Sequence, residues 1–212
     1  MVLNDLRYML LSRRAWWFTA TARTRARFAR TILGSFWLGL SNLLSIAALG
    51  LVYGTVFKVQ NFQSYFIYLG FGLVTWNTIC SSISSAPTLF AHNSANIKNM
   101  NVPPLFYSLE EWAFQVQTFA QSFGLVFIVL AIFNPFIVVN LFSSAWLPIL
   151  NLILFIYWTP LVICLVGAWY TDLSQLVPIA LQIVFLVSPI LYAKKNLGSL
   201  AWVSNWNPFY RI

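Results

Sequence analysis

The sequence predicts an all-α membrane protein, a single transmembrane domain over residues 1–212 that forms a bundle of about five helices. Sixty consecutive residues, Trp112 to Thr171, include no Asp, Glu, Lys, Arg or His. The whole chain is 60% hydrophobic and 8% charged, whereas soluble domains average about a quarter charged residues. Since about 20 apolar residues cross a bilayer core as a helix, the uncharged stretch is long enough for two crossings and a hairpin.

Other classes of protein fit this composition poorly. A soluble chain of 212 residues cannot surround so much continuous apolar sequence with a polar shell. A membrane β-barrel would show alternating segments of about ten residues, but the apolar runs here are continuous. Cys80 and Cys164 both lie in apolar runs, and we interpret them as small buried residues without a disulfide or metal role.

Residues 1–30 predict an amphipathic helix on the cytoplasmic membrane surface. They hold seven of the twelve basic residues, and leucines recur at helical spacing. Arg23, Arg27 and Arg30 fall on one face of the predicted helix, where they suit lipid phosphates. A signal peptide would place its apolar region directly after a few charges. Nucleic-acid binding fits badly because a membrane span follows this segment.

The first two spans are predicted at Thr31–Phe57 and Tyr65–Leu89. Gly50 and Gly54 form a G-x-x-x-G pair in the first span, a pattern that permits close helix packing. The end of the second span contains two serine pairs and Pro87. Serine hydroxyls bond to nearby helix carbonyls, so a bundle tolerates this polar end.

The most polar interior stretch, His92–Glu111, is predicted to be cytoplasmic. A cytoplasmic amino terminus followed by two crossings returns the chain to that side. Apolar residues recur within the stretch, and we expect a short helix after Asn93 or Asn96 that stops before Pro103. An ordinary solvated loop is the alternative.

The rest of the chain is predicted as three apolar segments with short connections. Spans three and four are expected at Trp112–Ile132 and Leu147–Trp169, with an outer hairpin at Phe133–Pro148, where turn-forming residues cluster. A cytoplasmic turn containing Asp172 follows. The segment Leu176–Ala193 is short and contains prolines, so it either spans the membrane or forms a broken re-entrant element. Residues 194–212 are then expected outside.

Enzymatic motifs are missing from the sequence. It contains no phosphate-binding loop G-x-x-x-x-G-K-[ST], no H-E-x-x-H and no C-x-x-C, and His92 is its only histidine. We therefore expect no catalytic residue and no metal site. No acid or base is expected at membrane depth, which argues against a proton- or ion-coupled carrier.

Three stretches carry a resemblance to a known family. The first is Arg27–Trp37, which contains T-x-L-G-x-x-W, and the second is Asn96–Pro104. The third runs from Asp172 to Pro178 and continues through Ser188-Pro189-Ile190-Leu191-Tyr192 to Asn207-Pro208. In order and spacing these stretches resemble the permeases of type-2 ABC exporters, in the branch that exports O-antigen, capsule and teichoic-acid polysaccharides.

Two departures from the family pattern accompany this resemblance. The family often has a basic residue before the aspartate matched by Asp172, where this chain has Thr171. The family also ends with a sixth span, whereas this chain stops first. We therefore expect a partial sequence.

The resemblance implies a multi-pass permease of the bacterial cytoplasmic (inner) membrane, with a cytoplasmic amino terminus. It implies a homodimer that works with two separate ABC ATPase subunits, which bind ATP and Mg. This chain would then be no enzyme and would hold no nucleotide-binding domain and no cofactor. Its substrate would be a lipid-linked glycan such as a lipopolysaccharide O-antigen. The other partners expected are membrane lipids, and no nucleic acid.

Three groups of site residues follow from the resemblance and the chain's pattern. Arg23, Arg27 and Arg30 are expected at the substrate entrance, against the lipid headgroup. Tyr53 and Phe57 are expected to line the channel. The ATPase-coupling loop is expected at Asn96, Ile97, Lys98, Asn99, Met100, Asn101, Val102 and Pro103. The alternatives are a type-2 ABC exporter of a drug or small lipid, and a membrane scaffold or enzyme subunit without transport.

Overall fold

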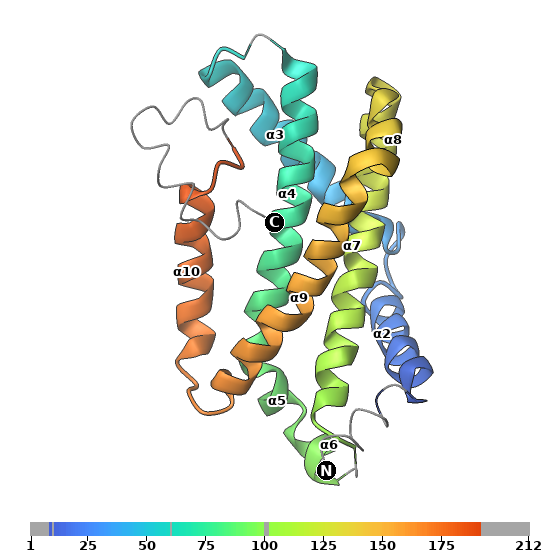
Figure 1. The fold of residues 1–212 in the computed structure, drawn as a ribbon, viewed down its shortest axis with the longest axis vertical. Helices are drawn as coiled ribbons and strands as arrows, with labels where there is room; N and C mark the ends of the chain where they lie inside the picture. Colours follow the sequence, from blue (N-terminus) through green and yellow to red (C-terminus); the bar gives the residue numbers. More distant parts are fainter. Residues whose placement is uncertain (1–8, 10, 60, 100–101, 192–212) are drawn as a thin grey trace. The chain divides into compact units, whose positions relative to one another are not determined.

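The computed structural model of the chain describes residue 9 and residues 11–59, 61–99 and 102–191 (Figure 1). Within these ranges the chain is predominantly helical and contains no strand, as the sequence predicted. The helical elements are α2 (Arg13–Arg27), α3 (Phe36–Val56), α4 (Phe62–Ser85), the 3-10 turn η1 (Ala86–Thr88), α5 (Leu89–His92), α6 (Ser94–Asn99), α7 (Leu105–Phe133), α8 (Phe136–Asn140), the π-helical η2 (Leu141–Ala145), α9 (Trp146–Gly167) and α10 (Leu173–Val187).

Four helical stretches of the described chain are long and apolar enough to cross a membrane. They are Phe36–Val56, Phe62–His92, Leu105–Phe133 and Phe136–Gly167. The fifth apolar helix, α10, has 15 residues and is about 22 Å long at 1.5 Å per residue. A bilayer core is about 30 Å thick, so α10 is short for a crossing, as the sequence indicated.

Two predicted boundaries were wrong. The third span begins at Leu105, not at Trp112, because proline suits the first turn of a helix and Pro103–Pro104 directly precedes it. The hairpin is also tighter than predicted, since the chain reverses around Asn134–Pro135. The following polar residues continue the helical path, and the hydroxyls of Ser143 and Ser144 donate to the carbonyl of Asn140. Figure 1 shows α8 leading into α9 along this path.

The residues group into two compact units. Unit 1 consists of Met1–Ser35, Thr78–Thr118 and Ile153–Pro178. Unit 2 consists of Phe36–Asn77, Phe119–Leu152 and Ile179–Ile212. The helices α4, α7, α9 and α10 each contribute residues to both units.

Unit 2 contains the predicted close packing at the G-x-x-x-G pair. A Cβ atom added to Gly50 would lie 2.6 Å from the ring of Phe66, and one added to Gly54 would lie 2.7 Å from the ring of Phe62. Both glycines are buried in α3, while the two rings belong to α4. The missing side chains therefore let α4 approach the backbone of α3, and the prediction is confirmed.

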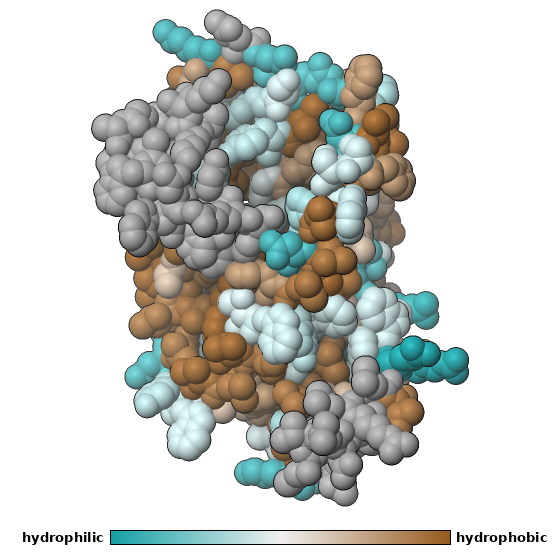
Figure 2. All heavy atoms as spheres, in the orientation of Figure 1, coloured by the Kyte–Doolittle hydropathy of each residue, from teal (hydrophilic) through white to brown (hydrophobic). Residues whose placement is uncertain are grey.

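Large apolar side chains remain exposed along the helices. On α9 they recur every three or four residues, at Leu150, Leu154, Trp158, Val162 and Leu165, each about half exposed or more. Figure 2 likewise shows hydrophobic residues at the surface over α10, where Ile179 and Ile183 are exposed. A soluble monomer rarely exposes such a continuous stripe, whereas lipid covers it in a membrane.

Candidate functional site

The polar centre of unit 1 forms where α2 packs against α7. The helix α2 buries Ala20 and Thr24, and Ala20 packs with Ala113 and Phe114 of α7. Trp16 of α2 lies 6.0 Å from Trp112 of α7, measured between ring centroids. Small residues on one face of α2 thus allow close contact, and the aromatic pair adds about 0.5–1.5 kcal/mol beyond its buried area.

A second aromatic contact connects α7 to α9. The ring of Trp112 lies 5.9 Å from the ring of Tyr157, and its indole N–H donates to the carbonyl of Ile153 at 2.9 Å. Trp112 therefore contacts both α2 and α9. These contacts fix the rotation of α7 about its own axis, and the neighbouring residue Glu111 then points into the interior of unit 1.

Glu111 is a buried carboxylate with three hydrogen-bond donors. The Nη1 group of Arg23 donates to its Oε2 atom at 2.6 Å. The hydroxyl of Ser85 and the amide of Gln115 donate to its Oε1 atom at 3.0 and 2.9 Å. Glu111 is 5% exposed, and such burial is tolerated because charged and neutral donors compensate the lost water. The cluster draws on α2, α4 and α7.

Arg23 contacts a second group as well. Its guanidinium carbon lies 4.4 Å from the ring centroid of Phe114, within the range of a cation–π contact. Its side chain remains 47% exposed. The network also extends one residue further, since the hydroxyl of Ser81 donates to Gln115 at 3.1 Å. Arg23 thus has one side against the protein and one side free for solvent or lipid.

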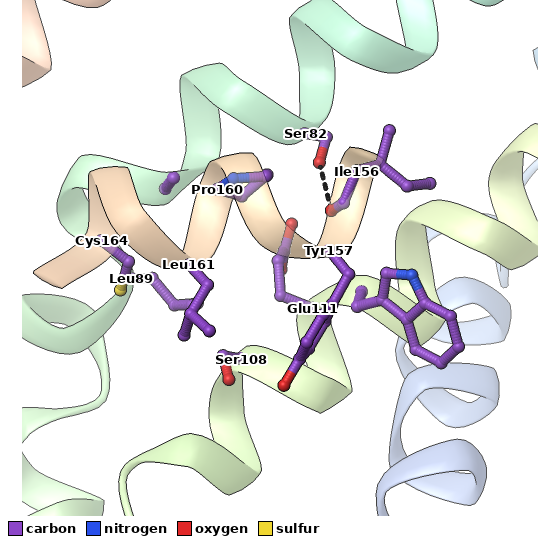
Figure 3. A pocket seen from close by; sticks show the side chains of 11 residues that line it. Ser82, Leu89, Ser108, Glu111, Ile156, Tyr157, Pro160, Leu161 and Cys164 are labelled. Carbon is purple, nitrogen blue, oxygen red and sulfur yellow. Dashed lines mark hydrogen bonds between the residues drawn. The ribbon is translucent and has the colours of Figure 1, made fainter. Parts of the chain in front are cut away.

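A narrow cavity lies beside this cluster. Figure 3 shows side chains of Ser108, Glu111 and Tyr157 around it, with Ser82 donating to the carbonyl of Ile156 at 3.1 Å. The cavity measures about 10 Å³, which is room for about one water molecule. It is too small for a substrate. Among the described residues, no group of three His, Cys, Asp or Glu is arranged to hold a metal ion.

The predicted coupling loop contains the short helix that the sequence predicted. Asn96, Ile97, Lys98 and Asn99 all lie in α6, whose first turn is closed by the N–H of Ile97 donating to the carbonyl of Asn93 at 2.9 Å. Ile97 is half-buried and its three neighbours are exposed. The prediction of a short helix after Asn93 is confirmed, and its role in coupling stays a prediction.

The remaining residues of the coupling loop flank this helix. Val102 and Pro103 precede α7 and are half-buried, and the carbonyl of Pro103 accepts from the N–H of Phe106 at 2.9 Å. Met100 and Asn101 lie outside the described residues.

The three predicted headgroup arginines do not share one helical face. The helix α2 ends at Arg27, and Arg30 lies in the turn after it, so the predicted shared face was wrong for Arg30. Phe28 ends the helix because its backbone leaves the helical region. Arg27 and Arg30 are exposed, whereas Arg23 is held by Glu111.

The predicted channel residues Tyr53 and Phe57 are neighbours in unit 2. Their rings stack at 5.7 Å with an interplanar angle of 21°. Tyr53 is half-buried within α3, and Phe57 follows the last residue of that helix and is exposed. Their shared side of the helix is therefore confirmed, while their place in a channel stays a prediction.

Comparison with known proteins decides the family. Residues 17–212 match the sequence profile of a family described as ABC-2 type transporter. The chain belongs to that family. It is also similar to two O-antigen export system permease proteins RfbA of Klebsiella pneumoniae. One is 21% identical over 188 residues and the other 24% identical over 192 residues, and each alignment covers 87% of this chain and 71% of the relative.

This ABC-2 chain is therefore a multi-pass transporter permease. Family membership also implies ABC ATPase subunits as partners. The three segments of the permease predicted to be cytoplasmic, namely α2, the α6 segment and the turn before α10, all belong to unit 1. The predicted outer hairpin Phe133–Pro148 belongs to unit 2. Which of these segments are cytoplasmic stays a prediction.

Sequence reasoning missed the buried role of Glu111 in this permease. Glu110 and Glu111 were assigned to a polar loop, and no acid was expected at membrane depth. The structure places both in α7, a helix long enough to span. The prolines before Leu105 were the available signal for an earlier helix start.

Proposed function

We propose that this ABC-2 permease exports a lipid-linked polysaccharide across the bacterial cytoplasmic membrane. It acts as half of a homodimer driven by two separate ABC ATPase subunits, which bind ATP and Mg. The observation that carries the proposal is the similarity to two O-antigen export permeases over 87% of the chain. Family membership supports separate ATPase subunits as the source of energy.

The coupling element in this proposal is α6. Its exposed residues Asn96, Lys98 and Asn99 form a polar knob that an ATPase cleft can hold, while half-buried Ile97 faces inward. A helical knob transmits force better than a flexible loop because its backbone is fixed. The start of α7 six residues later carries the motion into a membrane span, and Pro103 and Pro104 stiffen the connection.

The substrate assignment is supported by the aromatic residues of the chain and by exposed arginines. Aromatic residues make up 18% of the chain, and flat rings offer apolar faces over which sugars slide. Arg27 and Arg30 are exposed near the end of α2, where they suit a pyrophosphate headgroup at the membrane surface. Arg23 contributes its exposed side, with its charge balanced by Glu111.

The experiment is deletion and complementation in the native strain, where the cognate ATPase is present. Loss of the gene should remove long polysaccharide from the cell surface and leave lipid-linked polysaccharide inside, and the plasmid-borne gene should restore export. Surface polysaccharide is measured by extraction and gel electrophoresis. Unchanged surface polysaccharide, with altered resistance to a drug or altered export of a small lipid, would reject the proposal.

A further inference from the structure

Two asparagines meet within the membrane-spanning part of unit 2. The amide nitrogen of Asn77 on α4 donates to the side-chain oxygen of Asn42 on α3 at 2.7 Å. Asn42 lies six residues after the start of α3, and Asn77 lies eight residues before the end of α4. At 1.5 Å per residue, these positions are about 9 and 12 Å from the nearest helix ends. The pair is therefore well inside both helices.

The amide pair has hydrogen-bonding capacity left over. Asn42 also donates to the carbonyl of Leu38 at 2.9 Å. A primary amide has two N–H donors and an oxygen with two lone pairs, so the oxygen of Asn77 and one N–H of each residue have no partner among the described residues. Asn77 is exposed and Asn42 is half-buried. The unused groups of Asn77 are therefore accessible from outside the unit.

Two serines lie near Asn42 on α3, beside exposed apolar residues such as Val52 and Val56. Ser41 and Ser45 are exposed, and each hydroxyl donates to a carbonyl of its own helix, which leaves lone pairs outward. Tyr53 follows Asn42 by eleven residues, which is about three turns at 3.6 residues per turn. Asn42 and Tyr53 therefore lie on nearly the same side of α3. The exposed stripe of α9, in contrast, carries large apolar side chains such as Leu154 and Val162.

The unpaired amide groups of Asn42 and Asn77 are unsuited to lipid. Leaving an amide unpaired in hydrocarbon is unfavourable, so these amides must meet water, a second copy of the chain or a polar ligand. Amides that bond to hydroxyls, next to an aromatic ring that takes an apolar face, match the chemistry of a sugar. A drug or a lipid acyl chain offers few hydroxyls and would leave the amides unpaired.

We propose that Asn42 and Asn77 form a hydrogen-bonding contact for a hydroxyl-rich glycan as it passes along the α3–α4 face. The inference rests on the proposed function and adds the residues that recognise the sugar chain. The contact is weak, because a hydrogen bond to the glycan replaces hydrogen bonds to water and its net contribution is small. A chain that must keep moving requires contacts of this strength.

The first test replaces both amides with an apolar side chain of similar size, N42L/N77L, in the native strain. Surface polysaccharide should fall about tenfold, while the amount of permease in the membrane, ATPase co-purification and basal ATP hydrolysis remain at wild-type levels. Asn77→Gln, which keeps an amide, should retain most export. Asn140→Leu is the matched control, since Asn140 is an exposed asparagine of unit 2 that belongs to α8 and not to α3 or α4.

The second test measures contact directly. A photo-crosslinking amino acid at Ser45 should form an adduct with the strain's polysaccharide, detected by its specific antiserum, whereas the same group at Val162 should not. If Ser45 crosslinks instead to a second copy and N42L/N77L reduces dimer, the pair is a subunit contact and the inference is wrong. Normal export by N42L/N77L also overturns it, while the deletion phenotype separately tests the proposed function.

Discussion

The guanidinium of Arg23 lies 2.6 Å from the carboxylate of Glu111, 88 residues away in the sequence. The two partners differ in burial, since the side chain of Glu111 is 6% exposed and that of Arg23 is 47% exposed. A partner that loses its counter-charge suffers most when water cannot replace it. The pair therefore anchors α2 to α7. Because only Glu111 is buried, removing Arg23 and removing Glu111 should affect stability differently.

Arg23→Gln should destabilise the permease more than Glu111→Gln. The first change leaves the buried Glu111 charge with only neutral donors, which we expect to lower the free energy of unfolding by about 1–3 kcal/mol after allowance for partial solvent exposure. The second change leaves a half-exposed cation that water can solvate. The measurement is thermal unfolding of the detergent-purified protein.

The control for this comparison is Arg25→Gln, because Arg25 is exposed on the same helix. The double variant R23Q/E111Q should resemble E111Q alone, since it contains no buried unpaired charge. Equal stability of R23Q and R25Q would show that the ion pair does not anchor α2.

Alanine should destabilise the permease at Gly167 but not at Gly124. A Cβ atom at Gly167 would lie 2.7 Å from backbone atoms of Pro87 in unit 1, whereas one at Gly124 would meet nothing within 4 Å. Backbone atoms cannot move aside cheaply, so Gly167→Ala should destabilise by about 1–3 kcal/mol. Gly124→Ala lies inside α7 and should be neutral or stabilising by up to about 1 kcal/mol. Thermal unfolding of both variants checks this, and similar melting temperatures would contradict the packing at Pro87.

Much of the fold followed from the sequence, because the length of an apolar run determines whether a helix can span a bilayer. The predicted fourth span, Leu147–Trp169, differs from helix α9, Trp146–Gly167, by only one or two residues at each end. The hairpin was harder, because Asn140 and the serines after it are turn-forming residues that here bond within a helix. Local sequence cannot distinguish a turn from a helix at these residues.

The candidate site was less predictable for a related reason. Glutamate is most often exposed, so Glu110 and Glu111 indicated a loop. Only the approach of Arg23, Ser85 and Gln115 makes the burial of Glu111 favourable, and Arg23 comes from a distant part of the chain. The short helix α6 was predictable, since the asparagine before it and the prolines after it are local signals.

The topology is tested by labelling single cysteines in intact cells, in a background with Cys80 and Cys164 replaced by alanine. Because basic residues concentrate in residues 1–30, the positive-inside rule places Lys98 and Asp172 in the cytoplasm, and Gln60 and Asn140 outside. An impermeant maleimide should therefore label cysteine at 60 and 140 only. Gln60 lies outside the described residues. Labelling at 98 but not at 140 would reverse the orientation and remove α6 from the reach of an ATPase.

The stacked rings of Tyr53 and Phe57 should affect transport and not assembly. Y53A/F57A removes two apolar faces from the predicted conduit, and we expect surface polysaccharide to fall several-fold, because aromatic contacts contribute about 0.5–1.5 kcal/mol each. Membrane levels and ATP hydrolysis should not change. Phe136→Ala, at an exposed ring of α8, serves as the control. Normal export by Y53A/F57A would place these rings against lipid or protein.

The central claim is ATP-driven polysaccharide export coupled through α6. Inverted membrane vesicles that contain the permease, its ATPase and lipid-linked polysaccharide test it directly, because exported polysaccharide enters the vesicle and becomes protected from added glycosidase. ATP should confer protection with the wild-type permease. A variant with Gly-Ser residues at positions 97–101 should confer none and should lose the ATPase on purification, although its dimer persists. Protection that appears without ATP, or that the Gly-Ser variant supports fully, would contradict the account.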